Sequence, residues 1–122
     1  YLSIKAIFMN KTIKKIFFNL INSINGLKTT FKEHSFVAEL VGGLILIPYL
    51  IIINLDNVFK LIIISTYFLL LAFELVNTSI EKLSDKISKD FDTDIKKIKD
   101  ISSASVFVIL SLLIVLLILT IF

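Results

Sequence analysis

The sequence predicts an all-helical membrane protein in which an amphipathic N-terminal helix precedes three transmembrane helices. Of the 122 residues, 57% are hydrophobic and only 19% are charged, and the mean hydropathy is +0.94. Soluble domains are about 45–50% apolar and about 25% charged. With three glycines, one proline and no cysteine, the chain cannot be a disulfide scaffold or a cysteine-based zinc module. We therefore expect a single membrane domain over residues 1–122; the first residue is Tyr1 rather than Met, which leaves the true N-terminus open.

Three long apolar runs predict the transmembrane helices. A bilayer needs about 20 helical residues to cross its hydrocarbon core. Residues 101–122 carry no charge and satisfy this length directly. The uncharged runs 40–55 and 61–73 reach it only by taking in Glu39 and Glu74, respectively. A buried helix of a soluble protein is the alternative for the middle run, but this composition supplies few polar partners for it. We predict transmembrane helices at 36–55, 59–83 and 101–121.

Residues 10–31 predict an amphipathic helix that lies in the membrane interface. Apolar side chains recur there every three or four residues, and lysines and asparagines fill much of the opposite side. Because lysines interrupt each short apolar stretch, the segment is not a secretory signal peptide. The apolar positions are Ile13, Ile16, Phe17, Leu20, Ile21, Ile24, Leu27 and Phe31.

The lysines predict the orientation, since the chain has no arginine. Six lysines precede the first predicted span, six lie between the second and third, and Lys60 alone lies in the first hairpin. The positive-inside rule places the N-terminus and the 82–100 loop in the cytoplasm and the C-terminus outside. These two cytoplasmic faces account for the net charge of +3, so we expect no nucleic-acid partner.

A polar stripe runs along the second predicted span. Its members are spaced three, four and four residues apart and so fall within roughly 80° of one helix face. An ionisable group inside a bilayer costs about 2.5–3.5 kcal/mol and is by default a functional hypothesis. The structural alternative is that Glu74 is simply protonated or paired within a helix bundle, and that Asp85 is an ordinary loop residue. The stripe consists of Glu74, Asn77, Glu81 and Asp85.

Other charged residues are expected at the same depth. Glu33 lies at the mouth of the first span, and Lys99 and Asp100 lie where the third span enters the membrane. Carboxylates that converge with a lysine form an oxygen-rich site of the kind that Mg²⁺ prefers. Glu39 is either a residue of the pathway to this site or a partner for a neighbouring protomer, and we expect His34 to be a solvated residue at the interface.

These residues resemble the signature of a known family. Residues 74–85 match the ExxNxxxExxxD pattern of the small bacterial membrane diacylglycerol kinases and their undecaprenol kinase relatives. Lys99 and Asp100 are similar to the Lys-Asp pair before the family's third span, and Ser103 to a small residue after it. Residues 23–27 and 33–39 resemble the SxxGL and ExxFxxE segments. The resemblance covers roughly residues 12–122.

The resemblance implies a homotrimer in the bacterial inner membrane, with active sites shared between protomers. It implies transfer of the γ-phosphoryl group of ATP, with Mg²⁺, to the hydroxyl of diacylglycerol at the cytoplasmic interface, giving phosphatidic acid. By the same resemblance Glu74 is catalytic, and Glu33 and Glu81 bind the metal. Nucleotide contacts are implied for Asn77, Asp85, Asp90, Phe91, Lys99, Asp100 and Lys15, and lipid contacts for Glu74, Ser103, Phe31 and Ser23.

Some positions depart from the family pattern. The acidic-Tyr-His segment of the cytoplasmic loop reads Asp90-Phe91-Asp92 here, which lacks a ring hydroxyl and an imidazole. An arginine near the N-terminus is replaced by Lys14 or Lys15, which lack the guanidinium fork. Two alternatives stay open: the same chemistry on undecaprenol, and a small proton-coupled transporter or scaffold without ATP turnover. The transporter is less favoured, because a proton-coupled carrier is expected to place its acidic residue near the midplane of the bilayer, whereas the acidic residues here cluster toward the cytoplasmic face.

Overall fold

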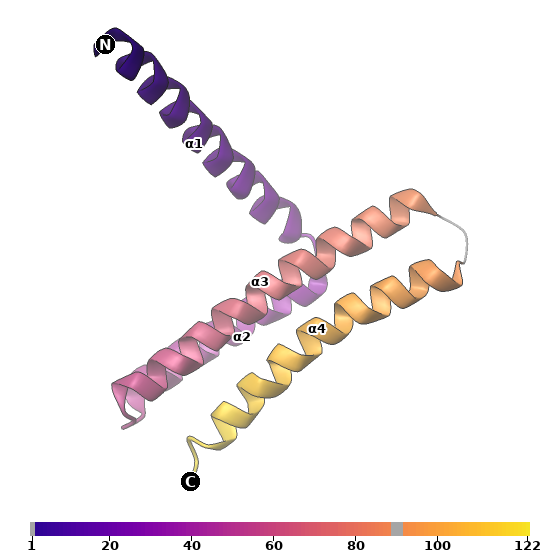
Figure 1. The fold of residues 1–122 in the computed structure, drawn as a ribbon. Coiled ribbons are helices and arrows are strands. Elements are labelled where there is room, and N and C mark those ends of the chain that lie inside the picture. Colours follow the sequence, from indigo (N-terminus) through magenta and orange to yellow (C-terminus); the bar gives the residue numbers. More distant parts are fainter. Residues whose placement is uncertain (1, 89–91) are drawn as a thin grey trace. The chain divides into compact units, whose positions relative to one another are not determined.

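The computed structural model describes residues 2–88 and 92–122, with side chains from Lys11 onward. The described residues form four helices (Figure 1): α1 (Leu2–Thr30), α2 (His34–Ile52), α3 (Asn57–Ile87) and α4 (Thr93–Ile118). The chain divides into two compact units, one that holds α1 and one, Glu33–Phe122, that holds α2, α3 and α4.

The three helices of the second unit are each long and apolar enough to cross a membrane. The prediction of an all-helical protein with three such helices is confirmed. Helices α3 and α4 both extend beyond the predicted membrane segments 59–83 and 101–121, toward the connection between them. The charged residues in these extensions are helical. α1 covers nearly all of the segment 10–31 that was predicted to be an amphipathic helix; its amphipathic character and its position in a membrane interface stay predictions.

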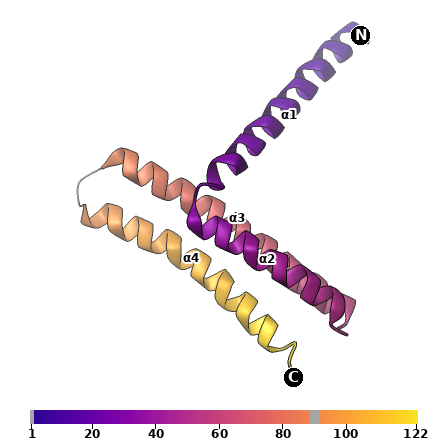
Figure 2. The same cartoon turned by 180° about the vertical axis from the view of Figure 1, so that it is seen from behind.

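Helix α3 is the central helix of the second unit. It packs against α2 and against α4, and the two opposite views show α2 and α4 each running alongside it (Figures 1 and 2). An aspartate starts each of the two longest helices of this unit. The Asp56 carboxylate accepts hydrogen bonds from the backbone N–H groups of Val58 and Phe59, and the Asp92 carboxylate caps α4 in the same way. A carboxylate at this position satisfies free N–H groups and favours the positive end of the helix dipole.

The core of this unit lies on one face of α3. Ile63, Tyr67 and Leu70 are buried there at the four- and three-residue spacing of a helix face. They pack with Leu46 and Leu50 of α2 and Leu113 of α4.

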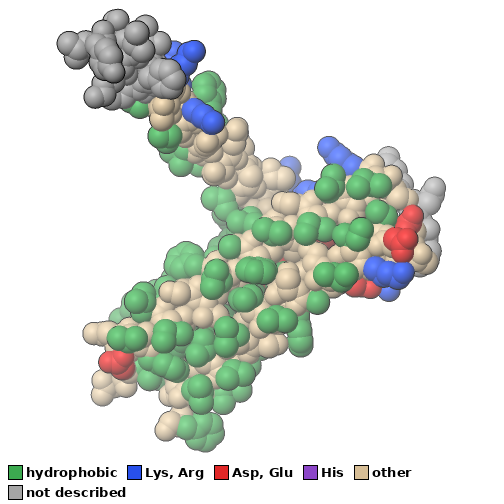
Figure 3. Space-filling model, viewed as in Figure 1, with side chains coloured by type: hydrophobic (Ala, Val, Ile, Leu, Met, Phe, Trp, Pro, Cys, Tyr) green, Lys and Arg blue, Asp and Glu red, His purple; other side chains and the backbone are tan. Residues whose placement is uncertain are grey.

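The outer surface of α2, α3 and α4 is largely apolar. On the face drawn in Figure 3, hydrophobic side chains cover most of this unit, while charged ones gather near the connection between α3 and α4. Apolar patches of this extent are rare on soluble monomers. The surface is therefore that of a protein whose middle contacts lipid or other protein chains.

A glycine brings α2 close to α3. The Tyr67 side chain lies against Gly43 and donates a hydrogen bond to the backbone oxygen of Glu39 at 3.1 Å. A Cβ atom on Gly43 would collide with the Tyr67 ring and hydroxyl, whereas a Cβ atom on Gly42 would meet nothing within 4 Å. Small residues allow such close helix contacts in membranes.

We predict that Gly43→Ala lowers the free energy of unfolding by about 1–3 kcal/mol, as overpacking of a tight contact does. The new methyl group would displace the Tyr67 ring and break its hydrogen bond to Glu39. The matched variant Gly42→Ala should change stability by less than about 1 kcal/mol. Thermal unfolding of both variants in detergent micelles checks this, and equal effects of the two substitutions would contradict it.

Candidate functional site

Two residues of the polar stripe are buried on α3. Glu74 is 3% exposed and Asn77 is 6% exposed. The Asn77 amide nitrogen donates to Glu81 Oε1 at 3.3 Å, while Asn77 Oδ1 is buried without a hydrogen-bond partner. An unsatisfied buried polar atom costs about 1–3 kcal/mol, which indicates that a water molecule, an ion or a ligand atom completes this site.

Glu39 of α2 faces this part of α3. Its carboxylate interacts electrostatically with that of Glu74, and its Oε2 atom is buried without a hydrogen-bond partner. Two carboxylates in apolar surroundings repel each other strongly, since the low dielectric does not screen them. A proton, a cation or a hydroxyl group between them would lower this repulsion. The structure thus associates Glu39 with Glu74 of its own chain.

An apolar groove between α2 and α4 leads to Glu39. Its outer part, about 440 Å³, is lined by Gly42, Ile45 and Tyr49 of α2 and by Ile114 and Ile118 of α4, among others. Its inner part, about 330 Å³, shares Gly42, Leu46 and Leu117 with the outer part and reaches Glu39. The hydroxyl groups of Tyr49 and Thr120 share a hydrogen bond that links α2 to the residues after α4. The groove suits a hydrocarbon chain whose polar end lies near the acids.

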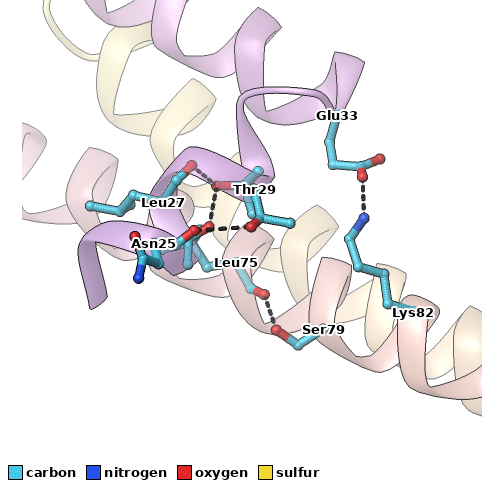
Figure 4. Close-up of polar contacts among 9 residues, drawn as sticks. Asn25, Leu27, Thr29, Glu33, Leu75, Ser79 and Lys82 are labelled. Atoms are coloured by element: carbon cyan, nitrogen blue, oxygen red, sulfur yellow. Dashed lines mark hydrogen bonds and ion pairs between the residues drawn. The ribbon is translucent and has the colours of Figure 1, made fainter. Parts of the chain in front are cut away.

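Glu33 pairs with a lysine rather than with the second predicted metal ligand. It occupies the N-cap position of α2, yet its side chain caps no backbone N–H group. Instead it forms an ion pair with Lys82 of α3 (Figure 4). In the described part of the chain, no three histidine, aspartate or glutamate side chains form a group that could hold a metal ion. Metal binding by Glu33 and Glu81 therefore stays a prediction.

A second ion pair joins α3 to α4 near their connection. Lys99 Nζ lies 3.0 Å from Asp85 Oδ1, while Asp100 pairs with Lys96 at 3.2 Å. Three residues predicted to contact the nucleotide, Asp85, Lys99 and Asp100, thus take part in partly or well exposed ion pairs. Exposed pairs of this kind contribute little to stability, so their side chains can exchange partners for a phosphate group or a cation.

The remaining predicted site residues lie apart from this cluster or outside the described structure. Ser103 is exposed on α4. Lys15 and Ser23 are exposed on α1, where the Ser23 hydroxyl donates to the backbone oxygen of Asn19, and Phe31 follows α1. These three belong to the first unit, so their roles stay predictions. Asp90 and Phe91 lie outside the described residues.

The sequence contained a signal for one contact that was not predicted. α2 ends at Ile52 and α3 begins at Asn57, so their connection is centred between Asn54 and Leu55, and the residue of α3 as far from this centre as Glu39 is Leu70. Glu74 lies four positions further on, which is about one helical turn along the same face of α3. The same count puts residue 76 of α3 level with Glu33, so it does not predict the pairing of Glu33 with Lys82.

Comparison with known proteins places the chain among membrane lipid kinases. A model of prokaryotic diacylglycerol kinases matches residues 21–122. The chain belongs to this family. A relative, the diacylglycerol kinase of Haemophilus influenzae, is 35% identical over 89 residues, which are 72% of this chain and 75% of the relative. With the three apolar helices, this membership indicates a membrane protein that acts as a diacylglycerol kinase-type lipid kinase.

We predict that exchanging the two charges of the α3–α4 ion pair separates structure from function. The double variant Asp85→Lys/Lys99→Asp restores an ion pair, so thermal stability should change by less than about 1 kcal/mol. Lipid kinase activity should fall about 10²- to 10⁴-fold, because a charged hydrogen bond worth about 1.5–3 kcal/mol is lost at each position. Full activity in the exchanged variant would mean that the pair has only a structural role.

Proposed function

We propose that this chain transfers the γ-phosphoryl group of ATP to the free hydroxyl of diacylglycerol and so forms phosphatidic acid. The observation that supports this most directly is the buried carboxylate of Glu74, which lies beside an unsatisfied amide oxygen in a chain of the diacylglycerol kinase family. The groove reaches Glu39, which interacts electrostatically with Glu74, and a buried carboxylate in this region is suited to accept a proton from a lipid hydroxyl.

In the proposed reaction, Glu74 acts as the general base. The hydroxyl oxygen attacks the γ-phosphorus, the bond from that phosphorus to the β–γ bridging oxygen breaks, and ADP leaves. The hydroxyl proton passes to the Glu74 carboxylate, which must lie within hydrogen-bond reach of it. Glu39 interacts electrostatically with Glu74, so a proton transferred to Glu74 would lower the repulsion between the two carboxylates. Phosphoryl transfer depends mainly on this kind of positioning and on charge neutralisation.

The donor atoms present fit a hard divalent cation. Asn77 Oδ1 is buried and unsatisfied, and Glu81 is held beside it by the Asn77 amide. Mg²⁺ prefers one or two carboxylates together with phosphate oxygens, so Glu81 and Glu33 would hold it. When bound, Mg²⁺ would neutralise charge on the phosphates. Lys99 is the side chain in this cluster that is suited to bind a phosphate group as a point charge.

We further propose a homotrimer in the inner membrane, with the cluster at the cytoplasmic face. The lysine distribution supports this orientation, since Lys82, Lys86, Lys96, Lys97 and Lys99 all flank the α3–α4 connection. One chain offers few metal ligands and an open groove, which supports a site completed by a neighbouring protomer. The exposed apolar side chains Ile16, Phe17 and Leu20 of α1 support an interfacial position for that helix.

We predict that Glu74→Gln lowers lipid phosphorylation about 10²- to 10⁴-fold, because a general base contributes that much. Labelled γ-phosphate transfer from MgATP would be measured in bilayer nanodiscs, separately with diacylglycerol and with undecaprenol. Asp94→Asn is the matched control, since it converts an exposed acid on α4 and should leave activity within about twofold.

Each outcome of this assay has a defined meaning. Preferential labelling of diacylglycerol supports the proposal, whereas preferential labelling of undecaprenol keeps the chemistry but corrects the acceptor. No transfer to either lipid by folded protein would overturn the proposal and favour a transporter or scaffold.

We also predict that removal of divalent cations with EDTA abolishes transfer, and that Glu81→Gln raises the Mg²⁺ concentration needed for half-maximal activity. The reason is that loss of one carboxylate ligand weakens binding of the cation. The dependence of activity on Mg²⁺ at saturating ATP measures this. An unchanged dependence in Glu81→Gln would exclude Glu81 as a ligand.

A further inference from the structure

The ion pair between Glu33 and Lys82 joins the start of α2 to α3 through a proposed metal ligand. It joins residues 49 positions apart (Figure 4). At the N-cap of a helix, a serine, threonine, aspartate or asparagine side chain commonly accepts a hydrogen bond from a backbone N–H group of that helix. Glu33 makes no such bond. Its carboxylate instead points to α3 and pairs with the ammonium group of Lys82.

The two proposed metal ligands have different partners in this structure. Glu81 accepts a hydrogen bond from Asn77, whereas Glu33 pairs with Lys82. Lys82 follows Glu81 in the sequence and projects about 100° away from it around α3, and its ammonium group meets Glu33. The ammonium group thus supplies positive charge to Glu33 where a divalent cation would do so.

We propose that Lys82 is a positioning residue that holds Glu33 near α3 and competes with the divalent cation for the Glu33 carboxylate. This inference rests on the proposed role of Glu33 and Glu81 as cation ligands. The Lys82 and Glu33 side chains are 48% and 35% exposed, so water screens their attraction. Pairs of this exposure shift an equilibrium by about two- to fivefold. A doubly charged ion can displace such a partner, and Lys82 then swings into solvent.

The proposal predicts tighter cation binding when the lysine charge is removed. The probe is Mn²⁺, measured by the electron paramagnetic resonance signal of the free ion, with the full chain in nanodiscs and no nucleotide. Lys82→Met keeps the apolar stem and should bind Mn²⁺ about two- to fivefold more tightly than the unaltered chain. Lys82→Arg keeps the charge and should restore the original affinity.

A matched control separates this competition from a general change in charge. Lys86→Met removes the same charge from an exposed position one turn further along α3 and should leave Mn²⁺ affinity within a factor of about 1.5, because a solvated charge beyond direct contact is screened by salt. In EDTA, Lys82→Met should also unfold at a lower temperature than Lys86→Met, because Glu33 then lacks a counter-charge. Saturating Mn²⁺ should remove that difference.

The outcomes distinguish this inference from the proposed function. Equal Mn²⁺ affinity in Lys82→Met and Lys86→Met, with binding that Glu33→Gln still weakens, would overturn the competition but leave the metal site. Mn²⁺ binding that is absent, or that is unaffected by both Glu33→Gln and Glu81→Gln, would overturn the proposed metal ligands together with this inference.

Discussion

The constraint on which this molecule depends is the cost of holding a carboxylate inside an apolar helix bundle. An ionisable group in a bilayer costs about 2.5–3.5 kcal/mol on insertion scales, and Glu74 is almost completely buried on a helix long and apolar enough to cross a membrane. Such a residue has to face protein or ligand rather than lipid. The rotation of α3 about its axis follows from this requirement, because Glu74 turns toward Glu39 of α2.

The same face of α3 carries both the core and the polar cluster. Along α3, from its N-terminal half toward its charged C-terminal end, the residues of this face recur at spacings of four, three, four, three and four. Such spacings describe one continuous helix face. Packing of the apolar half therefore fixes the direction of the polar half. The close contact between Tyr67 and Gly43 sets how closely α2 approaches α3, about one helical turn from Glu39. The face consists of Ile63, Tyr67, Leu70, Glu74, Asn77 and Glu81.

Most of this arrangement could be predicted from hydrophobic runs and helical periodicity. The three apolar helices follow from length and hydropathy, and the polar stripe follows from spacing along one helix. Contacts between helices were harder to predict, because they depend on how far each helix is rotated about its own axis, and side-chain packing determines that rotation. Lys82 illustrates this: a lysine next to Glu81 in the sequence gave no indication that it would pair with Glu33. The position of α1 and the number of protomers in the assembly depend on contacts with the membrane and with other chains. The sequence pattern of a single chain does not define those contacts.

The two kinds of acidic residue in the cluster differ in what they can exchange. Asp85, Asp100 and Glu33 are partly or well exposed and paired with lysines, and water already screens those pairs, so a phosphate or a cation replaces a partner at small cost. Glu74 and Glu39 have no lysine partner among the described residues. Their apolar surroundings screen charge only weakly, so the two carboxylates interact strongly with any cation or proton that reaches them. In the proposed reaction this division places reversible binding at the exposed end and proton transfer at the buried end. Nucleotide and cation can then bind and leave without disturbing the packed face that holds the base.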